Sequence, residues 1–257
     1  MCKLTCKHFK ECGGCALLDL PYTEQVARKR AKLAELLQPF WTAEIPVTLT
    51  DNPVYFRNKV ELGFCHQVKW DPNYNKKDPA NKTRPLVFEQ ALGFKLKGKW
   101  DRAVDIEECF LFNEKLIPLL KAVRAWAAAE GLEYYDQRKH TGVLRHLMVR
   151  EGKNTGEGMV VLFVTNDFNE KTFVAAVESV LPTFNIMSAV NNGLADTAAP
   201  ESLKVLKGQD SFVEKILLTD GAGKTEREVL FKLSPQSFFQ TNTKTAQKMY
   251  SRVRGLV

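Results

Sequence analysis

Six cysteines, four of them within the first 15 residues, constrain this 257-residue chain more than any other feature. Three of the four follow the spacing Cys6-x5-Cys12-x2-Cys15, and two glycines separate Cys12 from Cys15. Glycine lets the backbone fold closely around a metal or sulfide. The spacing therefore predicts three thiolates at one metal centre, and binding there would also supply folding free energy to the segment.

The compartment decides how these thiols are used. The opening MCKLTCKHFKECGG has no apolar stretch of the kind found in secretory signals, so we expect a cytoplasmic protein. A disulfide framework is not expected there. Spacing alone leaves three alternatives open: a structural zinc on Cys2, Cys6, Cys12 and Cys15, or one that recruits His8; an iron–sulfur cluster with a distant fourth ligand, for which Cys109 is the best candidate; or unligated thiols.

Charge adds a candidate partner. The formal net charge is +7, and 44% hydrophobic with 26% charged residues is a globular composition. Residues 1–100 carry 17 basic and 10 acidic residues, and residues 201–257 carry 10 and 6, so both ends are basic. This distribution favours a surface that meets polyanions, most simply nucleic acid. No window approaches 18 consecutive apolar residues, so a membrane partner is not expected.

Periodicity predicts a mixture of helices and strands, hence an α+β (α/β) fold. Helices are expected at 22–38, 114–130 (N-cap Asn113), 169–181 and from near Asn242 onward. Strands are expected at 59–66, 91–96, 143–150, 159–165, 186–191, 213–218 and 227–233. Residues 70–85, rich in Pro, Asn and Lys, predict an exposed loop or insertion. GAGKT at 221–225 ends like a phosphate-binding loop, but the first glycine position holds Leu218 and a strand follows, which favours a hairpin turn.

Three separated stretches resemble one enzyme family. They are CKHFKECGGCALLDLPYTEQ (6–25), TGVLRHLMVREG (141–152) and SPQSFFQTNTKTAQKMY (234–250), and they resemble the RNA 5-methyluridine methyltransferases. These enzymes transfer a methyl group from S-adenosylmethionine to C5 of uridine in ribosomal or transfer RNA. The resemblance implies a [4Fe–4S] cluster on Cys6, Cys12, Cys15 and Cys109. It also implies that Gln240 contacts S-adenosylmethionine.

The resemblance divides the chain into three parts. It implies a cluster-binding segment at 1–20, a mixed α/β RNA-binding domain at 21–233 with its loop insertion at 70–85, and the start of a class I (Rossmann-like) methyltransferase domain at 234–257. The glycine-rich cofactor motif, the catalytic Cys in its Asp-Pro-Pro-Arg context and the general base of the family do not occur in residues 1–257. No catalytic residue is therefore assigned here, and we expect the chain by itself to be inactive.

With catalysis assigned elsewhere, the role expected for this chain is to hold the RNA while the target uridine is flipped out of the base stack. Arg57, Lys59, Arg145 and His146 are the expected RNA contacts, and Tyr55 or Phe56 are candidates for stacking. We expect rRNA rather than tRNA as the partner, and a monomer. The alternative functions are a freestanding iron–sulfur or zinc RNA-binding module without catalysis, and a zinc-stabilised protein-interaction domain.

Overall fold

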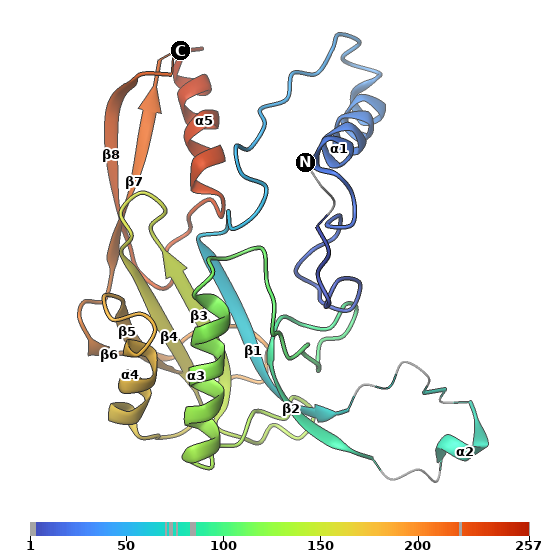
Figure 1. Cartoon of the computed structure of the whole chain (residues 1–257), viewed down its shortest axis with the longest axis vertical. Coiled ribbons are helices and arrows are strands. Elements are labelled where there is room, and N and C mark those ends of the chain that lie inside the picture. Colours follow the sequence, from blue (N-terminus) through green and yellow to red (C-terminus); the bar gives the residue numbers. More distant parts are fainter. Residues whose placement is uncertain are drawn as a thin grey trace.

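A six-stranded mixed sheet forms the centre of the protein (Figure 1). The computed structural model describes residues 4–256 apart from 70, 72–73, 76, 83–85 and 221–222. The strand order is β2-β1-β3-β4-β5-β6, and all neighbours are antiparallel except β4 and β5. The strands are β1 (Lys59–Val68), β2 (Phe88–Gly93), β3 (Leu144–Glu151), β4 (Gly158–Val164), β5 (Asn185–Val190) and β6 (Ser202–Lys207). Every residue of β3 and β4 is buried, so both faces of the sheet are covered at its centre.

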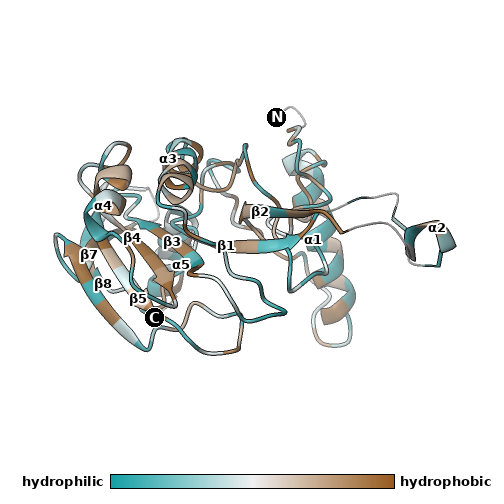
Figure 2. Cartoon of the chain, turned by 90° about the horizontal axis from the view of Figure 1, so that it is seen from below, coloured by the Kyte–Doolittle hydropathy of each residue, from teal (hydrophilic) through white to brown (hydrophobic). Residues whose placement is uncertain are grey.

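Helices α3 (Leu116–Ala129) and α4 (Glu170–Glu178) cover one face, as the view in Figure 2 also shows. The Trp126 indole lies between them and donates a hydrogen bond to Thr172 Oγ1 at 2.9 Å. Helix α3 is followed by Gly131 in the left-handed conformation (φ 63°), and the Asn169 side chain caps α4. Apolar residues of both helices complete the main core with the strands, among them Leu62, Leu119, Val123, Leu147, Val160 and Phe173.

The opposite face is covered by a two-stranded hairpin, β7 (Phe212–Thr219) and β8 (Thr225–Leu233). Helix α5 (Thr243–Arg254) packs on β7, and the Asn242 side chain caps its first turn. A second apolar cluster fills the space between the hairpin and the sheet. Its buried members are Met148, Met159, Val161, Phe163, Met187, Ala189, Phe212 and Leu233.

Two elements lie outside these layers. Helix α1 (Tyr22–Leu37) buries none of its residues and is tied to the strap that follows it by the hydrogen bond from Thr50 N to Tyr22 Oη, 3.0 Å. Helix α2 (Pro79–Lys82) lies at the end of a projection from β1 and β2 (Figures 1 and 2). In the described part of the chain, no helix combines the length and the apolar character needed to cross a bilayer.

Most predicted elements lie where the sequence placed them. The hairpin turn at GAGKT is confirmed by the pairing of β7 with β8, although 221–222 lie outside the described residues. The strand expected at 91–96 is found at Phe88–Gly93, and the helix expected to reach 181 ends at Glu178. Helix α3 begins at Leu116, two residues after the predicted start. Strand β6 was not predicted, because its residues are mostly exposed at the sheet edge and carry no clear alternation.

Candidate functional site

Four thiols come together at one small cavity beside the end of β2. Cys6, Cys12, Cys15 and Cys109, all partly exposed, line this cavity. Its other walls are mainly apolar, from Phe9, Leu18, Phe94, Ile106, Phe110 and Leu111. These are the four cysteines that the family resemblance selected, and they come from chain segments nearly 100 residues apart. Within the described residues, no three His, Cys, Asp or Glu side chains converge closely enough to hold one metal ion.

Backbone pairing fixes the N-terminal segment against the end of β2. Gly13 N donates to Lys95 O at 2.9 Å, and Lys97 N donates to Glu11 O at 2.7 Å. A Cβ atom on Gly13 would lie only 2.9 Å from Lys95 O, so this close approach requires glycine. The glycines between Cys12 and Cys15 thus serve the docking of the loop on the sheet as well as its turn.

A second set of contacts brings Cys109 to the same place. Glu107 N donates to His8 Nε2 at 3.0 Å, and Lys7 forms an ion pair with Glu107. On the other side of Cys109, Arg57 N donates to Leu111 O at 2.9 Å. His8, considered above as a zinc ligand, therefore uses its Nε2 atom to hold the Cys109 segment.

The chemistry of the four sulfurs suits a soft, positively charged group. Gly14 N donates to Cys12 Sγ and Leu111 N to Cys109 Sγ, both at 3.4 Å, and such donors stabilise negative charge on sulfur. Burial raises the pKa of Cys15 to about 11 and also raises that of Cys12 and Cys109, with the neighbouring thiols acting in the same direction. Cys2, the remaining candidate of the zinc alternative, lies outside the described residues.

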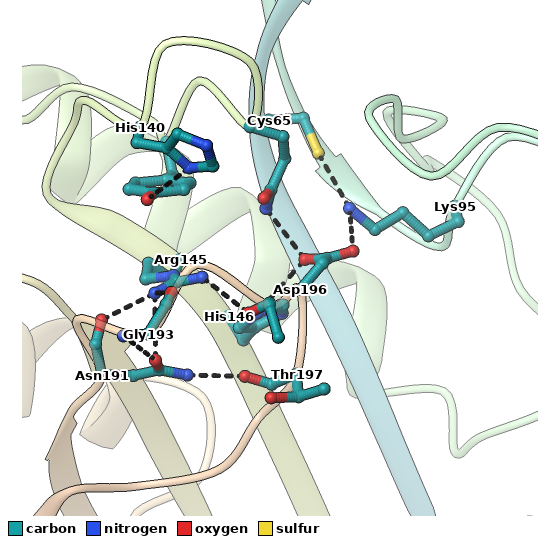
Figure 3. Close-up of polar contacts among 12 residues, drawn as sticks. Cys65, Lys95, His140, Arg145, His146, Asn191, Gly193, Asp196 and Thr197 are labelled. Carbon is teal, nitrogen blue, oxygen red and sulfur yellow. Dashed lines mark hydrogen bonds and ion pairs between the residues drawn. The ribbon is translucent and has the colours of Figure 1, made fainter.

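Cys65 belongs to a different environment. It is fully buried on β1, where burial raises its pKa to about 11, and Lys95 Nζ lies 3.6 Å from its sulfur (Figure 3). Lys95 also forms an ion pair with Asp196 at 2.7 Å. Cys65 is thus part of a polar network and does not line the cavity of the other four thiols.

Arg145 is not at the surface, where an RNA contact requires it. Its exposed fraction is 0%, and its guanidinium lies beneath the loop that follows β5 (Figure 3). Nη1 donates to Asn191 O at 2.9 Å and to Gly193 O at 2.6 Å, while Nη2 donates to Ala195 O at 3.0 Å. The Tyr135 ring lies 4.3 Å from Cζ. The expected phosphate contact is corrected accordingly: Arg145 holds the loop 191–197.

His146 needs the same correction. It is 6% exposed, and its Nε2 lies 3.4 Å from Asp196 Oδ1 (Figure 3). Burial is the largest influence on its pKa and lowers it to about 4, although Asp196 acts in the opposite direction. Asp196 is also held by Gln137 Nε2 at 2.8 Å. The sequence did not single out Asp196 or Gln137, because they come from separate loops with no motif linking them.

The other two expected RNA contacts are more accessible. Lys59 is about one-third exposed and forms an ion pair with Glu61 at 2.5 Å. Arg57 is half-buried beside the thiol cavity, and within the described residues its buried Nε makes no hydrogen bond. Arg57 also favours the thiolate forms of Cys15 and Cys109 electrostatically. It also helps to line a cavity of about 500 Å³, whose wall includes Cys15 as well.

The segment that contains Gln240 is fixed by buried polar side chains. Arg150 Nη1 donates to Ser234 O at 2.6 Å, and Asn58 Nδ2 donates to Gln240 O at 2.7 Å. Asn58 N in turn donates to Thr241 O at 2.9 Å. The Gln240 side chain is partly exposed at the end of this segment. Asn58 and Arg150, which sequence reasoning missed, thus position the backbone around the predicted cofactor residue.

Comparison with known proteins relates the whole chain to RNA methyltransferases. No protein-family model matches it. It is 30% identical to an uncharacterized RNA methyltransferase of Clostridium tetani, over 98% of this chain and 51% of that protein. An uncharacterized RNA methyltransferase of Clostridium acetobutylicum is 31% identical, over 96% of this chain and 50% of that protein.

A solved structure shares the fold. The tRNA (uracil-54, C5)-methyltransferase of Pyrococcus abyssi, in complex with S-adenosyl-L-homocysteine, aligns with a TM-score of 0.70 and 24% identity, covering 96% of this chain and 51% of that chain. The chain spans about half the length of the curated relatives it matches. It is therefore a mixed α/β chain related in sequence to RNA methyltransferases, with the fold of about half of a tRNA (uracil-54, C5)-methyltransferase.

Proposed function

We propose that this chain is the cluster-bearing, RNA-binding half of an S-adenosylmethionine-dependent RNA (uracil-C5-)-methyltransferase. The observation that carries the proposal is the sequence similarity of 98% of this chain to an RNA methyltransferase, together with the four thiols that line one cavity. In this view 1–20 is the cluster segment, 21–233 is the RNA-binding domain and 234–257 begins the methyltransferase domain. The whole protein then forms 5-methyluridine in RNA, and the proposed substrate is rRNA, with tRNA as the alternative.

The proposed resident group is a [4Fe–4S] cluster held by Cys6, Cys12, Cys15 and Cys109. Support comes from the all-sulfur donor set, the apolar walls and the two backbone amides directed at sulfur. A bound cluster would supply covalent cross-links between the N-terminal segment and the 106–111 segment. Its proposed role is structural: it keeps Arg57, which is paired to Leu111, at the edge of the large cavity.

In the proposed reaction, the residues of this chain bind the RNA and contact the cofactor. Arg57 and Lys59 are the accessible cations for RNA phosphates, and Gln240 contacts S-adenosylmethionine. Arg145 and His146 act indirectly, because they hold the loop 191–197 against the sheet. The nucleophile that adds to uracil C6 and the base that removes the C5 proton are assigned to the other half of the enzyme.

The first test is metal content. Protein purified without oxygen should contain about four iron and four sulfide per chain. Such protein should be brown, and Cys12→Ser or Cys15→Ser should remove this colour and destabilise residues 1–25. Stoichiometric zinc without sulfide would instead support the alternative of a zinc RNA-binding or protein-interaction module.

The second test separates the enzyme from a freestanding RNA-binding module. The 257-residue chain should bind structured RNA with an affinity that falls steeply with salt, but should neither transfer methyl groups nor bind S-adenosylmethionine. The longer protein should do both, and Gln240→Ala should weaken its cofactor binding. A covalent complex between residues 1–257 and 5-fluorouridine RNA would refute the assignment of the nucleophile to the other half.

A further inference from the structure

An aromatic pair, the exposed Phe88 and the half-buried His66, lies where β1 pairs with the start of β2, and neither residue lines the thiol cavity. The Phe88 ring, on a residue that is 42% exposed, stacks on the His66 ring with 5.2 Å between centroids and 6° between planes. Phe88 is the first residue of β2, and β2 is an edge strand. The neighbouring Leu86 and Val87 are exposed as well. An apolar edge in water is normally blunted or covered, so this one points to a partner.

Cations surround the pair. The Lys139 ammonium lies 5.4 Å from the Phe88 ring centroid, and the side chains of Lys139 and Arg138 are both 66% exposed. Lys69, just past the end of β1, is also exposed. The carboxylates that balance these cations, Asp101 and Asp136, are themselves buried beneath them. The outer surface therefore presents an aromatic ring and exposed cationic groups, while their carboxylate partners are buried.

The turn that presents the two cations is fixed in place. Asp136 Oδ1 accepts hydrogen bonds from Arg138 N at 2.9 Å and from Lys139 N at 3.1 Å. Asp136 N donates to Thr141 O at 2.7 Å, and His140, with φ 57°, is in the left-handed conformation that closes the turn. Tyr135 Oη lies 3.3 Å from His140 Nδ1 (Figure 3). Preorganised cations lose little freedom when they bind an anion.

We propose that Phe88, supported by His66, is a stacking platform for an unpaired base of RNA, and that Arg138 and Lys139 contact the flanking phosphates. This inference rests on the proposed RNA-binding function and adds a second contact region, because none of its residues is among those predicted from the sequence. Stacking on a ring requires a base that is not paired in a duplex. Base stacking is stronger than an exposed ammonium–ring contact, so an arriving base displaces Lys139 from the ring and leaves it free for a phosphate.

The test compares the full chain with single variants on two labelled RNAs: a hairpin with an unpaired loop of about seven nucleotides, and a blunt duplex of the same length. Phe88→Ala should weaken binding of the loop RNA about tenfold and leave the duplex nearly unaffected. Phe88→Trp should bind the loop RNA as tightly as the wild type or more tightly. Phe40→Ala, which removes another exposed ring far away on the strap after α1, is the matched control and should change nothing.

A second readout reports stacking directly. 2-Aminopurine in the loop should be quenched by the wild-type chain and by Phe88→Trp, but not by Phe88→Ala. Lys139→Gln should lower the slope of log affinity against log salt by about one. Equal binding of loop RNA by wild type and Phe88→Ala overturns the platform while leaving the proposed function intact. Absence of any RNA binding by the wild type overturns both, and Phe88-dependent binding of a polyglutamate peptide in place of RNA assigns the surface to an acidic protein partner.

Discussion

Arg145→Met tests the reassignment of Arg145 from a surface contact to an internal support. Methionine keeps most of the side-chain length but removes every guanidinium donor that Arg145 directs at the loop 191–197. Three backbone carbonyls, of Asn191, Gly193 and Ala195, then lose a charged donor, and the cation–ring contact with Tyr135 is lost too. Replacing both members of a buried ion pair can be neutral, but here all the partners except Asn191 Oδ1 are backbone carbonyls, which no substitution removes.

The magnitude follows from which carbonyls water can reach. Gly193 and Ala195 are exposed residues, so their carbonyls are rehydrated when the guanidinium leaves, whereas Asn191 is 3% exposed and its carbonyl stays unsatisfied. One unsatisfied buried carbonyl costs about 1–3 kcal/mol, and the lost contact with the Tyr135 ring about 1 kcal/mol. Together these two losses come to about 2–4 kcal/mol, and we therefore expect Arg145→Met to lower the free energy of unfolding by about 3 kcal/mol.

Urea denaturation followed by circular dichroism measures this change, and hydrogen exchange locates it. The amides of 192–197 should exchange faster in the variant if the loop opens locally. Arg28→Met is the matched control, because Arg28 is 58% exposed and forms an ion pair with Glu24 on α1, so its loss should cost less than about 0.5 kcal/mol. Unchanged stability in Arg145→Met, together with a clear loss of RNA affinity, would refute the reasoning and restore the surface contact.

Three further predictions concern the buried histidine and the thiol cavity. Because burial lowers the pKa of His146 to about 4, below its value in an unfolded chain, the unfolded state binds an extra proton at mildly acidic pH. The contribution of neutral His146 to the free energy of unfolding should be fully present above pH about 6.5, and about 3 kcal/mol of it should be lost as the pH drops to 4. Urea titrations at pH 7 and pH 5 should show a smaller loss of stability in His146→Asn than in the wild type. An equal loss in both proteins would contradict the burial argument. Cys109→Ser should lose iron and sulfide while Cys65→Ser keeps them, and the reverse pattern would show that the wrong fourth ligand was chosen. Gly13→Ala should lower cluster content and increase protease cleavage in residues 4–20, because the new methyl group meets a backbone oxygen at 2.9 Å; a fully loaded variant would contradict this close approach.

The sequence by itself determined the local elements and the identity of the thiols. Two β-rich runs on either side of a Gly-containing turn predicted the hairpin now seen as β3 and β4, and an Asn/Asp cap predicted a helix from 169, close to the start of α4, because turns and caps depend on neighbours along the chain. The Cys6, Cys12 and Cys15 spacing likewise fixed three of the four cavity thiols. Cys109 was the best distant candidate in the sequence and was also implied by the family resemblance, but only the folded chain brings it to the same cavity.

Only the tertiary structure decided which polar residues are inside. In sequence, Arg145 and His146 look like surface cations, since buried charges are rare and nothing local announces a loop that will cover them. The loop that supplies their partners lies about 50 residues later, and long-range contacts of this kind leave no periodic signal. Strand β6 escaped prediction for a related reason: an exposed edge strand is defined by pairing with its neighbour, not by burial of its own side chains. Side-chain burial depends on what packs above a residue, and that is settled when distant segments meet.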